Sequence, residues 1–352
     1  MSKSKSYQSL LQIMNAEQPI QAPAAIWNTR GSVGFPEGVT KIKDYYDNPE
    51  LKVKTQLFPL GVFDDITLIP GVWPDFGVAL EASAFGCEVT FRDNNPPVAL
   101  PFMKSIEDSK KLEPINPEKD GLMATALEQY KVMLEKLPKE ALEKIPYLDG
   151  CSLTTGPLEV ASMILGHTEF YMAFNLYPDL AKELLELVTE GIIDYLKALE
   201  KISGKIKLLS MIEHTPGQIS VKHFEEFGKP YISRIFNTFP EAIRVYHNED
   251  NVSHIADQLH EIGADIYHFG DIGDQSVKEF KARLKGDTIL MGNVHPLRTL
   301  LNGIPEDVRK ESEACVEAAK PRIILCSGGG LTSGTPRENL RTMIEVAHSA
   351  YK

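Results

Sequence analysis

The feature that most constrains this chain is an alternation of short apolar segments with longer segments of helical spacing. Eight of the apolar segments have the length and residue types of buried parallel strands. They cover residues 63–69, 88–91, 147–155, 206–212, 243–248, 265–270, 288–292 and 322–326. Because no linker or change of composition interrupts the series, it predicts an α/β fold, a (β/α)8 TIM barrel. A doubly wound open sheet is the alternative, since spacing alone does not show that a sheet closes.

The first part of the chain does not share this regularity. Residues 1–60 carry scattered prolines and glycines, so we expect them to form an N-terminal extension or cap. Residues 61–352 would then form the barrel. Within that range, the Asn and Pro residues at 94–97 are expected to end the second strand.

Several local signals place helix ends. Pro157 suits the first position of a helix, Gly204 suits the position after one, and Ser220 is a suitable N-cap. Thr335 and Glu338 have the spacing of a capping box, which predicts the start of the last helix.

The composition excludes several classes of protein. The net charge of -12 disfavours a nucleic-acid-binding surface, which needs clustered Lys and Arg. No apolar run is long enough to span a membrane or to act as a secretory leader, so we expect a cytoplasmic protein without a membrane partner. The four cysteines are irregularly spaced and include no CxxC pair, which does not favour a disulfide framework.

Polar residues follow directly after several of the expected strands. In a barrel the carboxyl ends of all strands meet at one mouth, so these side chains would converge there. The residues are Glu213, His214, His247, Glu249, His268, Asp271, Asn293, His295 and Cys326.

Some of these residue types are competent zinc ligands. His247 and Glu249 are two apart on an extended strand end, so their side chains can point to the same face. A catalytic zinc site uses three His, Glu or Cys ligands and one open position. Alternatively, His247 is a hydrogen-bonded packing residue, and Cys326 is only a small buried apolar group. Glu213 and His214 end an apolar strand and must be paired or solvated, and they could serve as a base or as ligands.

A glycine run, residues 328–330, precedes the last helix. Backbone amides and a helix N-terminus at this place would favour an anionic group of a ligand. The sequence is not a Walker A loop, because Thr335 follows Gly334 where that motif has Lys. Alternatively, the glycines provide only a tight turn.

Taken together, several motifs resemble those of the uroporphyrinogen decarboxylase superfamily from about residue 45 to the C-terminus. This superfamily includes porphyrinogen decarboxylases and the cobalamin-dependent methyltransferases related to methylcobamide:coenzyme M methyltransferase. The motifs lie at residues 155–162 with Gly166, at 219–220 with Phe224 and 230–231, at 246–248 followed by 263–265, at 292–296, at 327–330 and at 335–339. The resemblance implies a (β/α)8 barrel whose mouth accepts a tetrapyrrole or a corrinoid-bound methyl group.

The resemblance also helps to choose between the branches. The decarboxylase branch carries an Arg-rich N-terminal motif, whereas residues 25–31 contain one arginine, Arg30. A polycarboxylate substrate needs several cationic partners, so this difference disfavours decarboxylation. The methyltransferase branch binds zinc through His-x-Cys and a later Cys. His247 matches that histidine, but Glu249 and Gly329 stand where the cysteines would be.

The resemblance therefore leads to a specific expectation. The chain is a methyltransferase that moves a methyl group between a small substrate, such as a methoxylated aromatic donor or a thiol acceptor, and a separate corrinoid protein. We expect Glu213, His214 and His247 to be catalytic, and His247, Glu249 and Cys326 to hold zinc. Asn248, Asn293, Gly328 and Gly329 are expected to contact the cofactor. The alternatives are a metal-free decarboxylase and a non-catalytic corrinoid- or tetrapyrrole-binding protein, and the oligomeric state is open.

Overall fold

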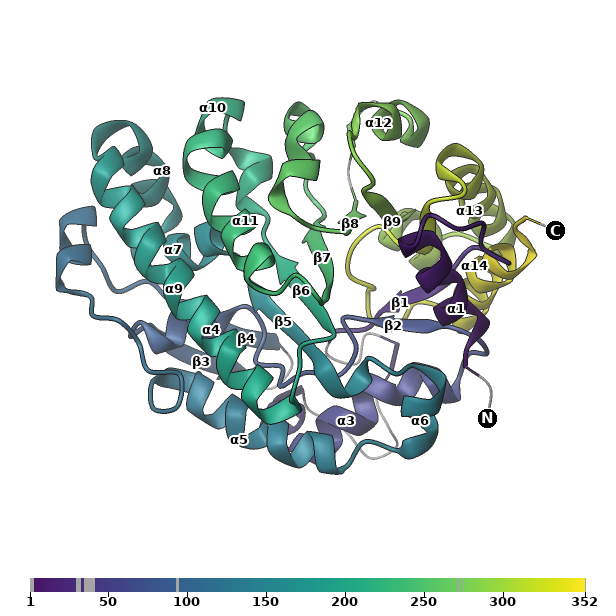
Figure 1. Ribbon diagram of the computed structural model, residues 1–352, viewed down its shortest axis with the longest axis horizontal. Helices are drawn as coiled ribbons and strands as arrows, with labels where there is room; N and C mark the ends of the chain where they lie inside the picture. Colours follow the sequence, from purple (N-terminus) through teal and green to yellow (C-terminus); the bar gives the residue numbers. More distant parts are fainter. Residues whose placement is uncertain are drawn as a thin grey trace.

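The computed structural model describes residues 3–29, 33–34, 42–92, 95–270, 272–273 and 275–351 (Figure 1). Its centre is a parallel sheet with the strand order β10-β9-β8-β7-β6-β5. The strands are β1 (Ala25–Trp27), β2 (Thr67–Ile69), β3 (Glu88–Arg92), β4 (Asn95–Leu100), β5 (Cys151–Thr155), β6 (Leu208–Ile212), β7 (Ile243–Asn248), β8 (Ile266–Phe269), β9 (Ile289–Val294) and β10 (Ile323–Ser327). Five of these strands, β1, β2, β5, β8 and β10, are buried along their whole length, as expected where helices cover a parallel sheet.

Strands β1 and β2 extend this sheet. They pair with each other in parallel, and a parallel bridge from Ala24 to Leu325 joins β1 to β10. Tyr147, which lies just before β5, donates a hydrogen bond to the carbonyl oxygen of Leu68 at 2.8 Å, and this contact brings the two outer edges together. The described part of the chain thus forms the eight-stranded parallel arrangement of a TIM barrel, in the order β2-β1-β10-β9-β8-β7-β6-β5.

One of the expected barrel strands is wrong. The segment at 88–91 forms β3, but β3 pairs antiparallel with β4 in a separate two-stranded sheet and is not a barrel strand. The prolines at 96 and 97 lie inside β4, where an edge strand tolerates their missing amides. Strand β1 takes the vacant place in the barrel. It belongs to residues 1–60, so this stretch contributes a barrel strand, and the division into an extension and a barrel stays a prediction.

The helices surround the strands (Figure 1). The α-helices are α1 (Lys5–Met14), α2 (Ile42–Asp47), α3 (Pro49–Leu57), α4 (Ala79–Ala84), α5 (Gly121–Glu135), α6 (Lys139–Lys144), α7 (Pro157–Leu165), α8 (His167–Leu176), α9 (Pro178–Ser203), α10 (Val221–His223), α11 (Lys229–Thr238), α12 (Val277–Arg283), α13 (Pro305–Ala319) and α14 (Arg337–Ser349). The 3₁₀-helical segments are η1 (Phe58–Gly61), η2 (Ile106–Lys111), η3 (Leu148–Gly150), η4 (Thr215–Gln218) and η6 (Ser253–Ile262), and the π-helical segments are η5 (Phe224–Gly228) and η7 (Pro296–Leu301). No helix in the described ranges has both the length and the apolar character needed to cross a bilayer.

Most of the expected helix ends are confirmed. Pro157 is the first residue of α7, Gly204 adopts a left-handed conformation after α9 with φ of 79°, and the Ser220 side chain accepts from the amide of His223. The prediction of a capping box at Thr335 and Glu338 is wrong. Helix α14 begins after Pro336, and the Thr335 hydroxyl instead donates to the carbonyl oxygen of Thr332.

Candidate functional site

The strand register aligns one row of residues across the barrel wall. Thr155 pairs with Ile212, Ile212 with His247, and His247 with His268. Paired residues of parallel strands point to the same side of the sheet, so the two imidazoles lie side by side. Their Nδ1 atoms are 2.8 Å apart. Trp27 of β1 stacks on His247 with ring centroids 4.5 Å apart and planes at 18°.

Three of the strand-end residues form a cluster. One potential ligand atom from each of His214, His247 and Glu249 lies within 4.8 Å of the others. His247 is buried, whereas the Glu249 side chain is 44% exposed at the mouth. Two imidazoles and one carboxylate are a donor set that catalytic zinc sites use. The sequence prediction that His247 and Glu249 lie together is in accord with this geometry, and His214 joins them.

The structure does not bring Cys326 into this cluster. The cysteine is fully buried in β10, and its Sγ atom lies 3.8 Å from the hydroxyl of Ser327. Burial raises the pKa of this thiol to about 11, so it is protonated at neutral pH. Its surroundings are those of a small buried apolar group, which was the alternative from sequence.

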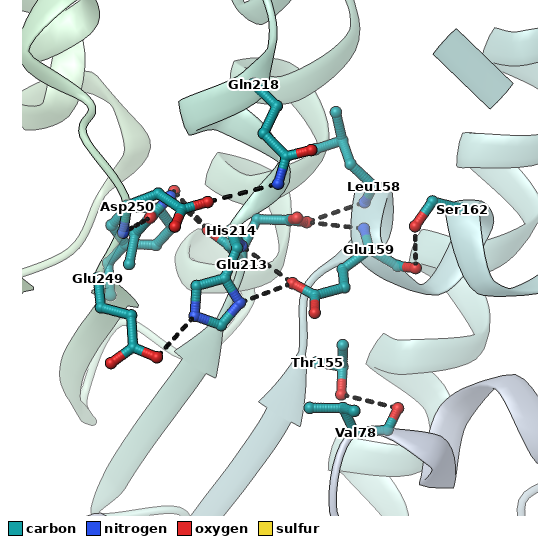
Figure 2. A network of polar contacts seen from close by, with 12 residues as sticks. Val78, Thr155, Leu158, Glu159, Ser162, Glu213, His214, Gln218, Glu249 and Asp250 are labelled. Atoms are coloured by element: carbon teal, nitrogen blue, oxygen red, sulfur yellow. Dashed lines mark hydrogen bonds and ion pairs between the residues drawn. The ribbon is translucent and has the colours of Figure 1, made fainter. Parts of the chain in front are cut away.

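Glu213 supports a helix next to the cluster. Its Oε2 atom accepts from the backbone amides of Leu158 at 2.9 Å and Glu159 at 3.3 Å, at the N-terminus of α7 (Figure 2). Helix α7 has no side-chain cap of its own, because Gly156 precedes it. Burial, and next the nearby Glu159 carboxylate, raise the pKa of Glu213 to about 8. Glu213, expected to be catalytic, therefore has a structural task in this geometry.

His214 is held by Glu159, a residue for which the sequence suggested no role. The Glu159 Oε2 atom accepts from the backbone amide of His214 at 2.9 Å and lies 3.1 Å from its Nδ1 atom (Figure 2). Burial lowers the pKa of His214, but the hydrogen bond and charge of Glu159 outweigh it and raise the pKa to about 9. The His214 Nε2 atom lies 4.0 Å from Glu249 and, among the described residues, has no hydrogen-bond partner. This nitrogen is therefore the one left to contact a ligand.

Glu249 lies against the glycine run. Its Oε2 atom accepts from the amide of Gly330 at 3.1 Å. A Cβ atom built on Gly329 would lie 1.9 Å from the same oxygen. The Glu249 carboxylate thus fills the room that a side chain at position 329 would need. The two positions where this chain departs from the His-x-Cys pattern are coupled in space.

Of the residues expected to contact the cofactor, Asn293 and Gly328 line a cavity and Asn248 does not. A cavity of about 450 Å³ beside Glu249 is lined in part by Asn293, His295 and Gly328. Asn293 also fixes the wall, because its Nδ2 atom donates to the carbonyl oxygen of Gly270 at 3.1 Å. The buried Asn248 side chain does not line this cavity; its Nδ2 atom donates to the carbonyl oxygen of Glu213 at 2.6 Å. Asp271 and Arg30 lie outside the described residues.

Comparison with known proteins shows the family of this chain. Residues 8–350 match the family described as uroporphyrinogen decarboxylase (URO-D). The chain belongs to the uroporphyrinogen decarboxylase family. This finding confirms the resemblance seen in the sequence.

Members of this family with different activities are similar to the chain. The methylcobamide:CoM methyltransferases MtbA of Methanosarcina acetivorans and Methanosarcina mazei are 26% and 27% identical, and each match covers 77% of both chains. The uroporphyrinogen decarboxylase of Thermodesulfovibrio yellowstonii is 24% identical over 92% of this chain and 93% of its own.

A solved structure is similar over nearly the whole chain. It is a methyltransferase from Methanosarcina mazei, with a TM-score of 0.78 and 21% identity over 98% of each chain. At this identity the likeness shows the fold, and it confirms the barrel.

Proposed function

We propose that this protein is a cobalamin-dependent methyltransferase that moves a methyl group between a small substrate and a separate corrinoid protein. The observation that carries the proposal is the cluster of His214, His247 and Glu249 at the mouth of a barrel of this family. The similarity to methylcobamide:CoM methyltransferases supports methyl transfer as the reaction. A cytoplasmic location and docking of the corrinoid protein over the mouth belong to the same proposal.

The residues of the cluster fit a zinc ion. His214 is oriented by Glu159, Glu249 is held by the Gly330 amide, and His247 lies between Trp27 and His268. A zinc ion would displace the Nε2 proton that His214 carries at neutral pH, where its pKa is raised to about 9. Such outer partners are typical of metal ligands. A bound zinc ion would supply a Lewis acid for the heteroatom that carries the methyl group. Cys326 is not part of this proposed set.

The chemistry of the donors suggests the kind of substrate. Imidazole and carboxylate form a harder set than the His-x-Cys and later Cys that the sequence resemblance implies for the methyltransferase branch. A harder site suits an oxygen-linked methyl donor, such as a methoxylated aromatic compound, better than a thiolate. The cavity of about 450 Å³ beside Glu249 offers room for a small donor, with Asn293 and Gly328 in its wall. Transfer by direct displacement requires the donor and the cobalt to lie in line.

The first experiment is elemental analysis of the purified protein and of two variants. We expect about one zinc per chain in the wild type, none in His247→Ala, and an unchanged content in His223→Ala. His223 lies in α10, outside the cluster, and serves as a matched control. Methyl transfer from methoxylated aromatics, followed by the cobalt spectrum of an added corrinoid protein, should disappear only in His247→Ala. Full zinc content and turnover in His247→Ala would refute the proposal.

A second candidate function is decarboxylation without a metal. It is favoured by the decarboxylase relative whose match covers 92% of the chain. Release of carbon dioxide from a porphyrinogen by zinc-free protein would support it. The single arginine in residues 25–31 disfavours it, because a porphyrinogen carries several carboxylates.

A further inference from the structure

We propose that His268 is a positioning residue that fixes the tautomer of His247, so that the Nε2 atom of His247 presents a lone pair to the metal site. The inference rests on the proposed function for the identity of the ligand. The tautomer itself follows from contacts within the protein.

The argument begins at the far end of a hydrogen-bonded chain. The Nε2 atom of His268 lies 2.9 Å from the carbonyl oxygen of Ser327. A carbonyl oxygen can only accept, so this Nε2 atom carries the hydrogen. Both imidazoles are buried and in contact with each other, which disfavours a charge on either ring, and a neutral imidazole has one N–H. The Nδ1 atom of His268 is therefore an acceptor.

The contact between the two histidines determines the tautomer of His247. Its Nδ1 atom lies 2.8 Å from the Nδ1 atom of His268, and one of the two must donate. Because Nδ1 of His268 is the acceptor, the Nδ1 atom of His247 carries the hydrogen. Its Nε2 atom is left with a free lone pair, which is the form in which a histidine binds a metal.

One further contact favours the opposite assignment and is weaker. The backbone amide of Gly329 lies 3.3 Å from the Nε2 atom of His268 and would donate to it if that nitrogen were unprotonated. Two lone pairs would then face each other over 2.9 Å, between this nitrogen and the Ser327 oxygen. A buried group without a partner is costly, so the shorter contact decides the tautomer.

The ring of Trp27 restrains both imidazoles. Its centroid lies 4.5 Å from each of the two histidine rings. Rotation of the His247 ring would break the stacked contact with Trp27 as well as the hydrogen bond to His268. A strand from the N-terminal part of the chain thus helps to hold the ligand in place.

The decisive test is nitrogen NMR of metal-free protein labelled with ¹⁵N-histidine. We expect a neutral Nδ1–H tautomer for His247 and a neutral Nε2–H tautomer for His268. The ring nitrogen signals of His247 are assigned by comparison with His247→Ala, in whose spectrum that set of signals is missing. An Nε2–H tautomer at His247 would overturn the inference. This measurement needs no metal, so its result is separate from the success or failure of the proposed function.

Two variants extend the test to binding. His268→Asn can keep an acceptor near the Nδ1 position, whereas His268→Phe keeps the ring shape without an acceptor. Zinc titrations against a chromophoric chelator should show affinity reduced about 10- to 100-fold in His268→Phe and largely restored in His268→Asn. Thermal unfolding checks that both variants fold. Equal zinc affinity of wild type and His268→Phe would overturn the positioning role, whereas absence of zinc binding in the wild type would refute the metal site itself.

Discussion

Glu249 and Gly329 illustrate how single residues define the site. A Cβ atom at Gly329 would collide with the Glu249 carboxylate, and φ of 112° strains any L side chain there. We predict that Gly329→Ala displaces Glu249 and weakens zinc binding roughly 10- to 100-fold. Titration with zinc in the presence of a chromophoric chelator measures the change.

Gly334→Ala is the matched control for that prediction. Gly334 also has a positive φ, of 88°, but a Cβ atom on it has open space. The Gly334→Ala variant should lose roughly 1–2 kcal/mol of stability through backbone strain and keep the zinc affinity of the wild type. If both variants bound zinc as the wild type does, the coupling of Glu249 and Gly329 would be wrong.

Glu81 lies outside the site, and its raised pKa predicts that stability depends on pH. Its buried Oε1 atom accepts from the Thr154 hydroxyl and the Thr155 amide, while burial raises its pKa from 4.5 to about 7. Between pH 4.5 and about 7, Glu81 is protonated in the folded state and ionised in the unfolded chain. The stability that the protonated Glu81 contributes at low pH is therefore lost as the pH rises through this range. The loss amounts to about 3 kcal/mol in magnitude.

The variant Glu81→Gln, which cannot titrate, tests this prediction. Its free energy of unfolding in urea should fall less than that of the wild type between pH 5 and pH 7.5, and the difference between the two should be constant above about pH 7. Parallel pH profiles for the two proteins would show that Glu81 titrates normally.

Local rules explain which site residues could be predicted from the sequence. His247 and Glu249 share a strand end, and the period of two along a strand places their side chains together. The pairing of His214 with Glu159 could not be predicted, because His214 follows β6, Glu159 lies in α7, and the two meet only after folding. Cys326 was assigned to the metal by its residue type, and the structure places it elsewhere.

At the level of elements, the N-terminus of α7 depends on a residue from another strand end. Glu213 accepts from the amides of Leu158 and Glu159, which otherwise lack a cap. We predict that Glu213→Leu, which removes the acceptor, is less stable than Glu213→Gln by roughly 1–3 kcal/mol. Urea unfolding at one pH measures the difference. Equal stability of the two variants would show that the amides find other partners.

Strands with strong apolar patterns were predictable, and irregular ones were not. Residues 243–248 carry Ile243, Val245 and Tyr246, residues 323–326 form an apolar run, and the two segments form β7 and β10. Strand β1 has only three residues and begins two residues after Pro23, so it gives too short a pattern to be distinguished from an extension. The segment at 88–91 has strand propensity, but propensity does not tell which sheet a strand joins.

The last prediction concerns the whole molecule, because β1 lies between β2 and β10 in the barrel. Its bridge to Leu325 and its pairing with β2 are the hydrogen-bonded contacts that join these strands among the described residues. A chain that begins at residue 61 would expose the edges of both strands and lose Trp27 from the site. We expect this fragment to lack a cooperative thermal transition by circular dichroism, whereas a chain that begins at residue 4 should keep it. Cooperative unfolding of the fragment would instead mean that residues 61–352 form a domain independent of the first 60.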